Sequence, residues 1–266
     1  MTRNQGRRAA AGAAAAIAGI AGLVEVAAQT APRDERRSGY TFMSPATQAM
    51  QRDDTANPGM LSVLEGGELW EAKAGAAGRS CADCHGDARV SMRGVAARYP
   101  AYDAARDSAI DLAGRIDECR TTRQAAPGLA RESRPLLALT TFVAHQSRGL
   151  PITAGDDPRL APALAAGRAL YEQRMGQINL SCANCHDDNW GRTLGSAPIP
   201  QAHPTGYPIY RLEWQDVGSL QRRLRTCLTG VRAEPFAYGA PEYVAIELFL
   251  MSRARGMTLE TPGVRP

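Results

Sequence analysis

The distribution of apolar and polar residues predicts helices through most of this chain. Residues 136–148 and 244–255 each place apolar side chains at helical spacing, and each stretch ends in an arginine followed by a glycine. Late arginines and a terminal glycine are typical of a helix C-terminus. A further helical pattern begins near Glu65. We therefore predict a mainly α fold.

Two stretches lack this pattern. Residues 29 to about 60 are polar, and prolines at 32, 45 and 58 are expected to interrupt any helix. We interpret this stretch as an irregular arm that packs over the first domain. Residues 151–162 contain three prolines, a glycine and two aspartates, so we interpret them as a linker between domains.

The N-terminus has the layout of an export signal. Arg3, Arg7 and Arg8 precede an alanine-rich apolar run over residues 9–24, and small residues follow it. This layout predicts a signal peptide over residues 1–28 and a mature protein in the periplasm, which is an oxidising compartment. A retained membrane anchor is the alternative, although the run is short for a bilayer span.

Length and charge narrow the class of protein. A chain of 266 residues accommodates one large or two modest domains. The net charge of +4 is small and its cationic residues are scattered, so we predict no nucleic-acid interface. No apolar run in the body of the chain approaches the roughly 18 residues of a transmembrane helix, so we predict no membrane span.

Four of the six cysteines belong to two copies of one signature. The copies are Cys81-Ala-Asp-Cys84-His85 and Cys182-Ala-Asn-Cys185-His186. Two thiols one helical turn apart match the two vinyl groups of a porphyrin, and the adjacent histidine ligates the iron. One such motif is also compatible with a zinc site or a disulfide. Two motifs in one exported chain predict two covalently attached haem c groups, with the four cysteines holding the porphyrins and His85 and His186 on iron.

Both motifs lie within an internal repeat of roughly 100 residues. Trp70 and Tyr171 each stand eleven residues before the first cysteine of a motif. A further cysteine, Cys119 or Cys227, follows each motif, and both are preceded four residues earlier by an arginine. The repeat predicts a helix before each haem motif, a helix that carries the extra cysteine, and a closing helix.

This is the plan of a class I cytochrome c domain, so we predict two such domains in tandem, related by internal duplication. The N-terminal domain with its arm is assigned to residues 29–155 and the C-terminal domain to residues 156–266. Four aromatic residues at repeated positions are interpreted as core residues that pack the terminal helices together. They are Trp70, Tyr171, Phe142 and Phe249.

The repeat also offers one further ligand for each haem iron. Cys119 and Cys227 occupy equivalent positions, and a thiolate is a strong donor to ferric iron. The methionines and the remaining histidines do not repeat. We interpret His145 as a core or surface residue and His203 as part of a loop that covers the second haem. A disulfide between the two cysteines is the alternative, because export permits one.

The surroundings of the two cysteines differ in charge. Cys119 follows two acidic residues, whereas Cys227 follows Arg222, Arg223 and Arg225. Arg223 lies four residues before Cys227 and therefore on the same helical face. There it can neutralise a dianion that arrives at the sulfur, or pair with a haem propionate, and both roles stay open.

Several segments together resemble the SoxA family, the dihaem subunit of the SoxAX cytochrome of bacterial sulfur oxidation. They are Ser38-Gly39-Tyr40-Thr41-Phe42-Met43-Ser44-Pro45, Asn57-Pro58-Gly59-Met60, the two haem motifs and residues 223–236. The resemblance covers nearly the whole mature chain, and the combination of motifs is specific.

The resemblance implies a function and a set of partners. Members pair with the monohaem cytochrome c subunit SoxX, and the complex acts as an L-cysteine S-thiosulfotransferase. It joins thiosulfate oxidatively to a cysteine of the carrier protein SoxYZ, giving a cysteine S-thiosulfonate, and two electrons pass through the haems to an acceptor cytochrome c. The position of Cys227 is the active-site cysteine, often a persulfide and also a haem ligand. Arg223 matches the substrate-binding position, and Cys119 matches the distal ligand of the first haem.

The chemistry of the residues agrees with this implication. Two sulfur nucleophiles do not join unless one is oxidised, so the coupling needs an electron acceptor and a way to offset anionic charge. We therefore predict Cys227 as the covalent sulfur, Arg223 as the anion clamp, and Arg225 or Arg232 as helpers. The rival hypotheses are a dihaem electron-transfer protein without catalysis of its own and a dihaem peroxidase.

Overall fold

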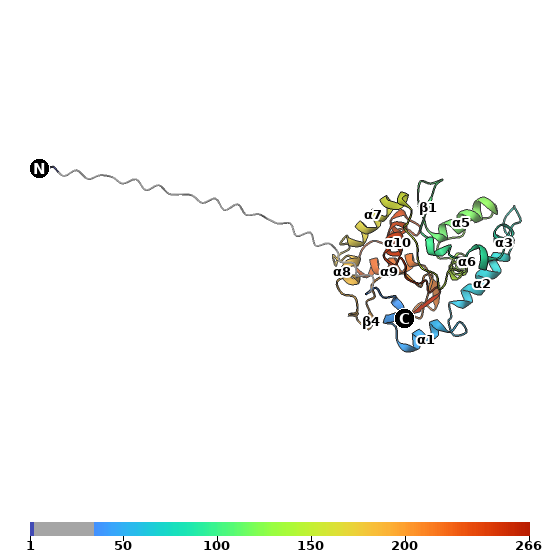
Figure 1. The fold of residues 1–266 in the computed structure, drawn as a ribbon, viewed down its shortest axis with the longest axis horizontal. Coiled ribbons are helices and arrows are strands. Elements are labelled where there is room, and N and C mark those ends of the chain that lie inside the picture. Colours follow the sequence, from blue (N-terminus) through green and yellow to red (C-terminus); the bar gives the residue numbers. More distant parts are fainter. Residues whose placement is uncertain (3–34) are drawn as a thin grey trace.

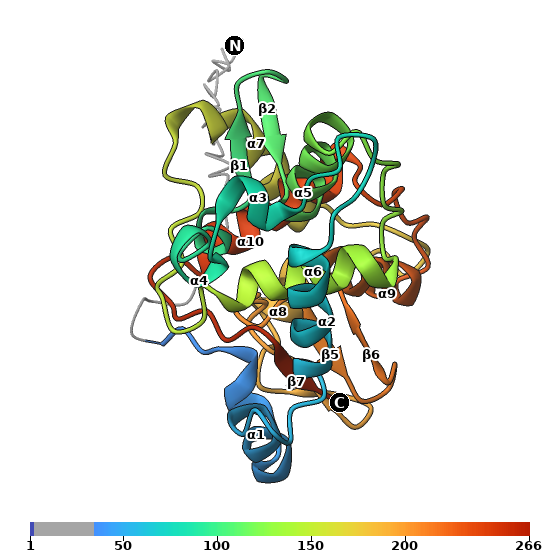
Figure 2. The same cartoon turned by 90° about the vertical axis from the view of Figure 1, so that its right-hand side faces the viewer.

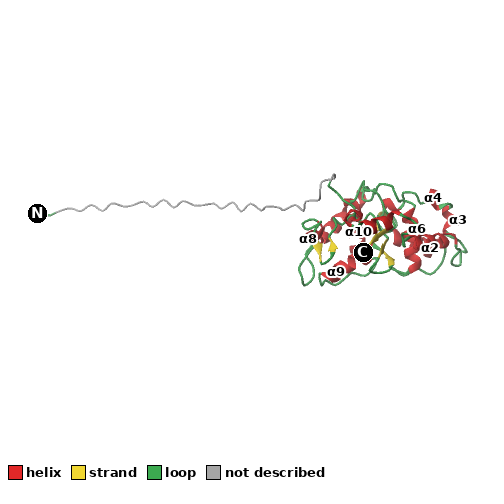
Figure 3. Cartoon of the chain, turned by 90° about the horizontal axis from the view of Figure 1, so that it is seen from below, coloured by secondary structure: helices red, strands yellow, loops and turns green. Residues whose placement is uncertain are grey.

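The computed structural model describes residues 1–2 and 35–266. The predicted signal peptide over residues 1–28 therefore lies outside the described residues, apart from its first two. Among the described residues, no helix combines the length and the apolar character needed to cross a bilayer. Helices dominate the fold and strands are few and short (Figure 3), which confirms the prediction of a mainly α protein.

The described chain forms two units, preceded by an arm, and both units share the order first helix, haem-motif helix, hairpin, cysteine-bearing helix and closing helix. The arm contains η1 (Gly39–Phe42) and α1 (Pro45–Arg52). The first unit contains α2 (Met60–Glu71), α3 (Cys81–His85), α4 (Ala88–Ser91), η2 (Ala96–Arg98), β1 (Ala101–Asp103), β2 (Ser108–Ile110), α5 (Leu112–Arg123) and α6 (Arg134–His145). The second contains η3 (Pro158–Leu160), α7 (Ala161–Glu172), α8 (Cys182–His186), β3 (Thr193–Leu194), β4 (Ala197–Pro198), β5 (Ile209–Arg211), β6 (Asp216–Gly218), α9 (Leu220–Gly230), α10 (Pro241–Arg253) and β7 (Gly263–Arg265).

The predicted duplication is visible in the arrangement of the helices. The closing helices α6 and α10 lie near the centre of the molecule, and the haem-motif helices α3 and α8 lie at opposite ends (Figure 1). Some helices begin earlier than the sequence predicts. α2 starts at Met60 rather than near Glu65, and α10 starts at Pro241. Proline is compatible with the first turn of a helix because that turn leaves its N–H groups unpaired.

The first and last helices of each unit cross at a glycine. A Cβ atom on Gly66 of α2 would overlap the carbonyl oxygen of Ala138 in α6, and one on Gly167 of α7 would overlap that of Ala245 in α10. The two backbones therefore approach closely in both units, and only glycine permits this. Sequence patterns did not single out these two positions, although they stand at equivalent places in the repeat.

Aromatic pairs stabilise the same crossings. The ring centroids of Trp70 and Phe142 are 5.8 Å apart in the first unit, and those of Tyr171 and Phe249 are 5.3 Å apart in the second. Trp70 is 4% exposed and Tyr171 is 1% exposed. Buried aromatic rings at such separations contribute both apolar burial and ring–ring attraction. The prediction that these four residues form the core between terminal helices is confirmed.

A β-hairpin that the sequence did not predict recurs in both units. Cis peptide bonds at Tyr99-Pro100 and Tyr207-Pro208 lead into the antiparallel pairs β1–β2 and β5–β6. The side chains of Asp111 and Ser219 then accept backbone hydrogen bonds and cap α5 and α9. Each hairpin thus fixes where the cysteine-bearing helix begins.

The arm packs differently from the prediction. α1 lies beside the C-terminal strand β7 (Figure 2), and β7 pairs in parallel with β5. The Gln51 side chain accepts a hydrogen bond of 2.9 Å from the backbone N–H of Val264, and the Ser38 hydroxyl donates to Glu260 at 2.6 Å. The arm therefore packs mainly on the second unit, and not over the first domain as predicted.

Pro45 does not interrupt a helix as the sequence suggested, because it occupies the first turn of α1 behind the Ser44 cap. The predicted linker also differs from expectation. Ile152 and Ala154 are each 1% exposed and belong to an apolar cluster that joins the two units. The linker is therefore a packed part of the core.

Candidate functional site

Each haem motif forms a short helix with a capping box at its N-terminus. In the first unit the Asp83 N–H donates to the Ser80 hydroxyl at 3.0 Å, and the Asp83 carboxylate accepts from the Ser80 N–H at 2.8 Å. Ser181 and Asn184 repeat this arrangement in the second unit. The reciprocal bonds satisfy free N–H groups of the first turn. They fix the turn on which the motif cysteines are presented.

The first unit encloses a cavity of about 390 Å³ among its helices. Its lining includes Cys81, Cys84 and His85 of the motif together with Cys119 of α5. Apolar side chains from α5 and α6, such as Val143, complete the wall. Thiols of the motif, a histidine and apolar walls are the surroundings that a c-type haem requires, so these residues fit the predicted group.

The second unit encloses a cavity of about 150 Å³ lined by His186, Cys227 and Arg223. The Nδ1 atom of His186 donates a hydrogen bond of 2.6 Å to the Pro200 carbonyl. This bond leaves Nε2 unprotonated in the neutral ring, as an iron ligand must be. Cys182 packs into the apolar cluster of this unit, beside α9. The residues present therefore fit a second haem.

The two extra cysteines differ in acidity. Burial raises the pKa of the Cys227 thiol, but the nearby His186 side chain and the charge of Arg223 outweigh burial and hold that pKa below its ordinary value. Burial also raises the pKa of Cys119, where the charge of Arg115 lowers it and the nearby carboxylate of Glu118 opposes that effect, so the pKa stays above its ordinary value. The surroundings of Cys227 thus favour the thiolate, the reactive form of a cysteine.

A disulfide between the two extra cysteines is excluded. All six cysteines lie among the described residues and all are free. Cys119 lines the cavity of the first unit, whereas Cys227 lines the cavity of the second. The repeat had suggested one cysteine for each haem; each cavity contains one of the two, and their ligation of iron stays a prediction.

The predicted arginines are not all brought together. Arg223 lines the cavity that contains Cys227. The guanidinium of Arg225 instead donates to the Phe236 carbonyl and lies over the Tyr238 ring, 4.6 Å from its centroid. Arg232 is exposed on the turn after α9. Neither of these two lines the cavity, so their predicted role as helpers stays a prediction without geometric support.

The histidines outside the motifs are placed as follows. The Nδ1 atom of His203 donates to the Arg37 carbonyl at 2.9 Å, and burial lowers the pKa of His203 to about 4. His203 lines the cavity of the second unit and ties it to the arm. His145 lies 3.3 Å from the Thr261 carbonyl, outside the lining of the first cavity.

Two lining residues of the second cavity were not predicted from the sequence. Tyr207 ends the segment before the β5–β6 hairpin, and Arg211 is the last residue of β5. The recurring Tyr-Pro-x-Tyr sequence at residues 99–102 and 207–210 is the signal that would have located both hairpins.

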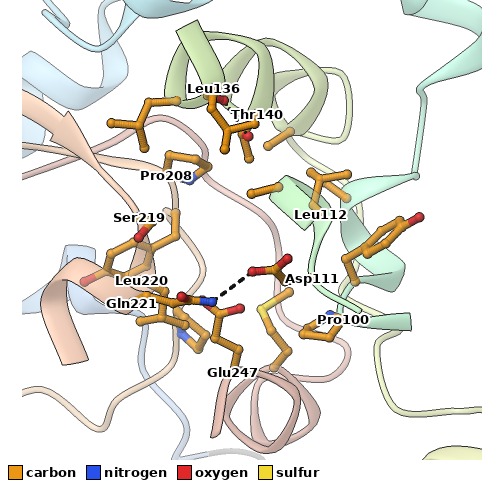
Figure 4. Close-up of a pocket in the computed structure, with 18 of the residues that line it drawn as sticks. Pro100, Asp111, Leu112, Leu136, Thr140, Pro208, Ser219, Leu220, Gln221 and Glu247 are labelled. Carbon is orange, nitrogen blue, oxygen red and sulfur yellow. Dashed lines mark hydrogen bonds between the residues drawn. The ribbon is translucent and has the colours of Figure 1, made fainter. Parts of the chain in front are cut away.

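A third cavity, of about 110 Å³, lies where the two units meet (Figure 4). Asp111 at the start of α5 and Glu247 of α10 point toward each other there, and the Gln221 side chain donates to Asp111 at 2.8 Å. Arg131 also donates to Asp111. None of the cysteines lines this cavity.

Glu247 makes stability depend on pH. Burial and the charge of Asp111 raise the pKa of Glu247 well above its ordinary value, although Arg131 opposes them. The folded state therefore binds this proton more tightly than the unfolded state does. The stability that the protonated Glu247 side chain contributes is fully present at pH values below its pKa in the unfolded state. It is lost as the pH rises through its pKa in the folded state.

Replacing Glu247 with glutamine is expected to raise the unfolding temperature, and to raise it more near about pH 8 than near about pH 5. The amide cannot ionise, so it removes the cost of a buried charge. Thermal unfolding of the haem-loaded protein at both pH values measures the difference. Glu68→Gln, at an exposed carboxylate of α2, is the control. Equal shifts at the two pH values would contradict this account of Glu247.

Comparisons with known proteins agree with this architecture. The family model for the SoxA/TsdA cytochrome c domain matches residues 65–152 and again residues 166–259. The chain is 37% identical over 235 residues to the L-cysteine S-thiosulfotransferase subunit SoxA of Pseudaminobacter salicylatoxidans, covering 88% of this chain and 82% of that relative. It is 33% identical to the protein of the same name from Paracoccus pantotrophus, covering 92% of this chain and 86% of that one.

Solved structures give the same result. The chain superposes with a TM-score of 0.84 on a chain in the crystal structure of SoxXA from P. pantotrophus, at 32% identity and with 87% of each chain covered. The two matched segments of the family model coincide with the two units of the fold, which confirms the prediction of paired cytochrome c domains. The chain therefore belongs to the SoxA family of c-type cytochromes.

Proposed function

We propose that this protein is an L-cysteine S-thiosulfotransferase that couples thiosulfate oxidatively to a cysteine of a carrier protein. The relatives named above carry that activity in their names. One observation carries the proposal for this chain: a free cysteine with a lowered pKa, Cys227, shares a cavity with a motif histidine and an arginine. An electron carrier does not require an acidic thiol beside a cationic side chain.

The reaction balances as an oxidation by two electrons. The Cys227 thiolate and thiosulfate form a sulfur–sulfur bond, which gives Cys227–S–S–SO₃⁻ and releases two electrons. The carrier thiolate then attacks the middle sulfur, takes over the S–SO₃⁻ group and restores the Cys227 thiolate. Haem iron, when bound, supplies the acceptor for the two electrons.

The residues of the chain take distinct roles in this scheme. Cys227 is the covalent sulfur and an iron ligand, and its acidic thiol makes it both a good nucleophile and a good leaving group. Arg223 offsets the two negative charges of thiosulfate as they approach a thiolate. Since Arg223 lies one helical turn before Cys227 on α9, the same helix positions both groups.

Two covalent haem c groups complete the site. Cys182 and Cys185 attach the haem of the second unit with His186 and Cys227 on iron. Cys81 and Cys84 attach the haem of the first unit, and the ligands to its iron are His85 and Cys119. The proposed domains run over residues 29–155, with the arm, and residues 156–266.

The proposed partners follow from the chemistry and from the relatives. A chain of this fold occurs in a SoxXA crystal structure, so we propose a SoxX-type monohaem cytochrome c as a stable partner. The carrier of the acceptor cysteine is a SoxYZ-type protein, and an acceptor cytochrome c removes the electrons. Both act in the periplasm, in keeping with the predicted signal peptide.

A reconstituted reaction tests this function. The haem-loaded protein with its SoxX-type subunit is mixed with thiosulfate, a SoxYZ-type carrier and ferric cytochrome c. The expected result is a carrier that gains the mass of one S₂O₃ group while two equivalents of cytochrome c are reduced. Low-temperature EPR of the oxidised protein is expected to show low-spin histidine–thiolate ligation. An unmodified carrier and histidine–methionine signals would instead favour the plain electron-transfer protein.

A further inference from the structure

One position in the repeat has reversed its charge between the two units. Asp103 is the last residue of β1 and pairs with Ser108 across the first hairpin, and Arg211 is the last residue of β5 and pairs with Asp216 across the second. Each follows its Tyr-Pro bond by the same number of residues. The two side chains therefore occupy equivalent places relative to the cysteine-bearing helices α5 and α9.

In the first unit this position supplies a counter-ion. The Asp103 carboxylate lies 2.7 Å from the guanidinium of Arg115, and Glu118 lies 2.7 Å from the same guanidinium. Arg115 is the repeat equivalent of Arg223. The arginine beside Cys119 is thus neutralised twice by the protein itself, which leaves it little attraction for an added anion.

In the second unit both counter-ions have been replaced. Arg211 stands where Asp103 would be, and Thr226, whose hydroxyl donates to the Arg222 carbonyl at 3.0 Å, stands in place of Glu118. Arg211 and Arg223 line the same cavity as Cys227. The second unit therefore has two guanidinium groups in the cavity of Cys227. The first unit has, at the equivalent positions, one arginine paired with two carboxylates.

The charge of Arg211 is only partly neutralised, by one half-exposed carboxylate. Its side chain is 13% exposed, and burial together with the charge of Arg223 lowers its pKa. The Nε atom forms an ion pair with the Glu213 carboxylate at 2.8 Å, but that carboxylate is 48% exposed, and Nε is buried without a hydrogen-bond partner. Two like charges in a half-buried cavity cost free energy unless an anion lies between them.

We infer that Arg211 is a second anion-binding residue of the Cys227 site, and that with Arg223 it binds the sulfonate end of thiosulfate. This inference rests on the proposed function and names how its substrate is held. The sulfonate carries most of the charge, so two guanidinium groups on it leave the outer sulfur of thiosulfate free to meet Cys227. Arg265 lines the same cavity but is already bound to Gln51 at 2.6 Å.

The first unit provides the design of the test. Arg211→Asp rebuilds at the second site the carboxylate–arginine pair that Asp103 and Arg115 already form in this fold. The variant protein, loaded with haem and bound to its SoxX-type subunit, is expected to show a KM for thiosulfate raised at least about tenfold, with kcat changed less than about threefold. Arg211→Lys is expected to restore part of the affinity, because lysine supplies the positive charge but not the planar guanidinium with its paired N–H donors.

The matched control is Arg168→Asp, which makes the same change of charge on α7. Arg168 is 56% exposed and pairs with Glu172 on the helix surface. Exposed charges are screened by solvent and salt, so the KM of this control is expected to stay within about twofold of the parent protein. Redox titration of the second haem supplies a readout other than activity: the potential is expected to fall in Arg211→Asp, because a negative charge replaces a positive one in the cavity that contains Cys227.

The outcomes separate the hypotheses. An unchanged KM in Arg211→Asp, with the parent protein active, would overturn this inference alone. A shifted haem potential with unchanged KM would also overturn it, since Arg211 would then act on the haem and not on the substrate. A parent protein that does not modify the carrier would refute the proposed function itself. If Arg211→Asp does not accumulate with both haems, Arg211→Gln gives the same comparison without adding a charge.

Discussion

Cys227→Ala is expected to lower the rate of thiosulfate coupling by at least about 10³-fold, because it removes the sulfur that forms the covalent bond. Both haems are expected to remain attached. The thioether bonds of the second haem come from Cys182 and Cys185, and the alanine leaves His186 and its bond to Pro200 in place. Mass spectrometry of the carrier measures coupling, and the pyridine haemochrome spectrum counts the haems.

Cys119→Ala is the matched control, since it makes the same change at the equivalent position of the first unit. It alters the predicted ligand of the first haem but leaves Cys227 and Arg223 unchanged, so coupling is expected to continue. Activity that survives in Cys227→Ala would remove Cys227 from the reaction. Activity lost equally in both variants would show that the two cysteines share a task, and the assignment of catalysis to the second unit would then be wrong.

Arg223→Gln is expected to lower kcat/KM for thiosulfate by about 10²-fold, because a charge-assisted contact to a doubly charged anion is lost from a partly buried site. High salt is expected to reduce the difference in kcat/KM between the parent protein and Arg223→Gln, since screening weakens the attraction between Arg223 and thiosulfate. Steady-state kinetics at low and high ionic strength measure both effects. An unchanged kcat/KM with a shifted haem potential would assign Arg223 to a haem propionate.

The equivalent substitution in the first unit is expected to act on stability instead. Arg115→Gln leaves the buried carboxylate of Asp103 without the guanidinium that lies 2.7 Å away. The remaining ion pair of Asp103, with Arg106 at 3.8 Å, is longer, so the folded state is destabilised and the unfolding temperature is expected to fall while the KM for thiosulfate stays unchanged. The two arginines stand at the same repeat position, and their different partners give them different tasks.

Local patterns were sufficient to predict most of the architecture. The haem signatures are continuous in sequence, and each is followed by one further cysteine that stands four residues after an arginine, so the sequence alone predicts one thiol for each haem. The closing helices were predicted from apolar spacing and late arginines. The structure starts α6 at Arg134 and α10 at Pro241, ahead of the predicted starts, since Pro135 and Pro241 suit the first turn of a helix.

Features that depend on contacts distant in sequence were not predicted. The strands of the two hairpins are three residues long, which is too short for an alternating pattern to be recognised. Arg211 was missed for this reason, since only the hairpin brings it to Cys227. The arm was predicted to lie on the first domain because it precedes that domain in sequence, whereas its partner strand β7 is formed by residues 263–265.

The hydrogen bond between Gln51 and Val264 also has a consequence for folding, because it joins the N-terminal arm to the C-terminal strand. Residues near opposite ends of the polypeptide are hydrogen-bonded to each other, so the arm cannot pack in place before the C-terminal residues have been synthesised. A chain that lacks the residues of β7 would lose the pairing of β7 with β5 and also the hydrogen bond between Val264 and Gln51 that holds the arm. Every haem-attachment residue would still be present.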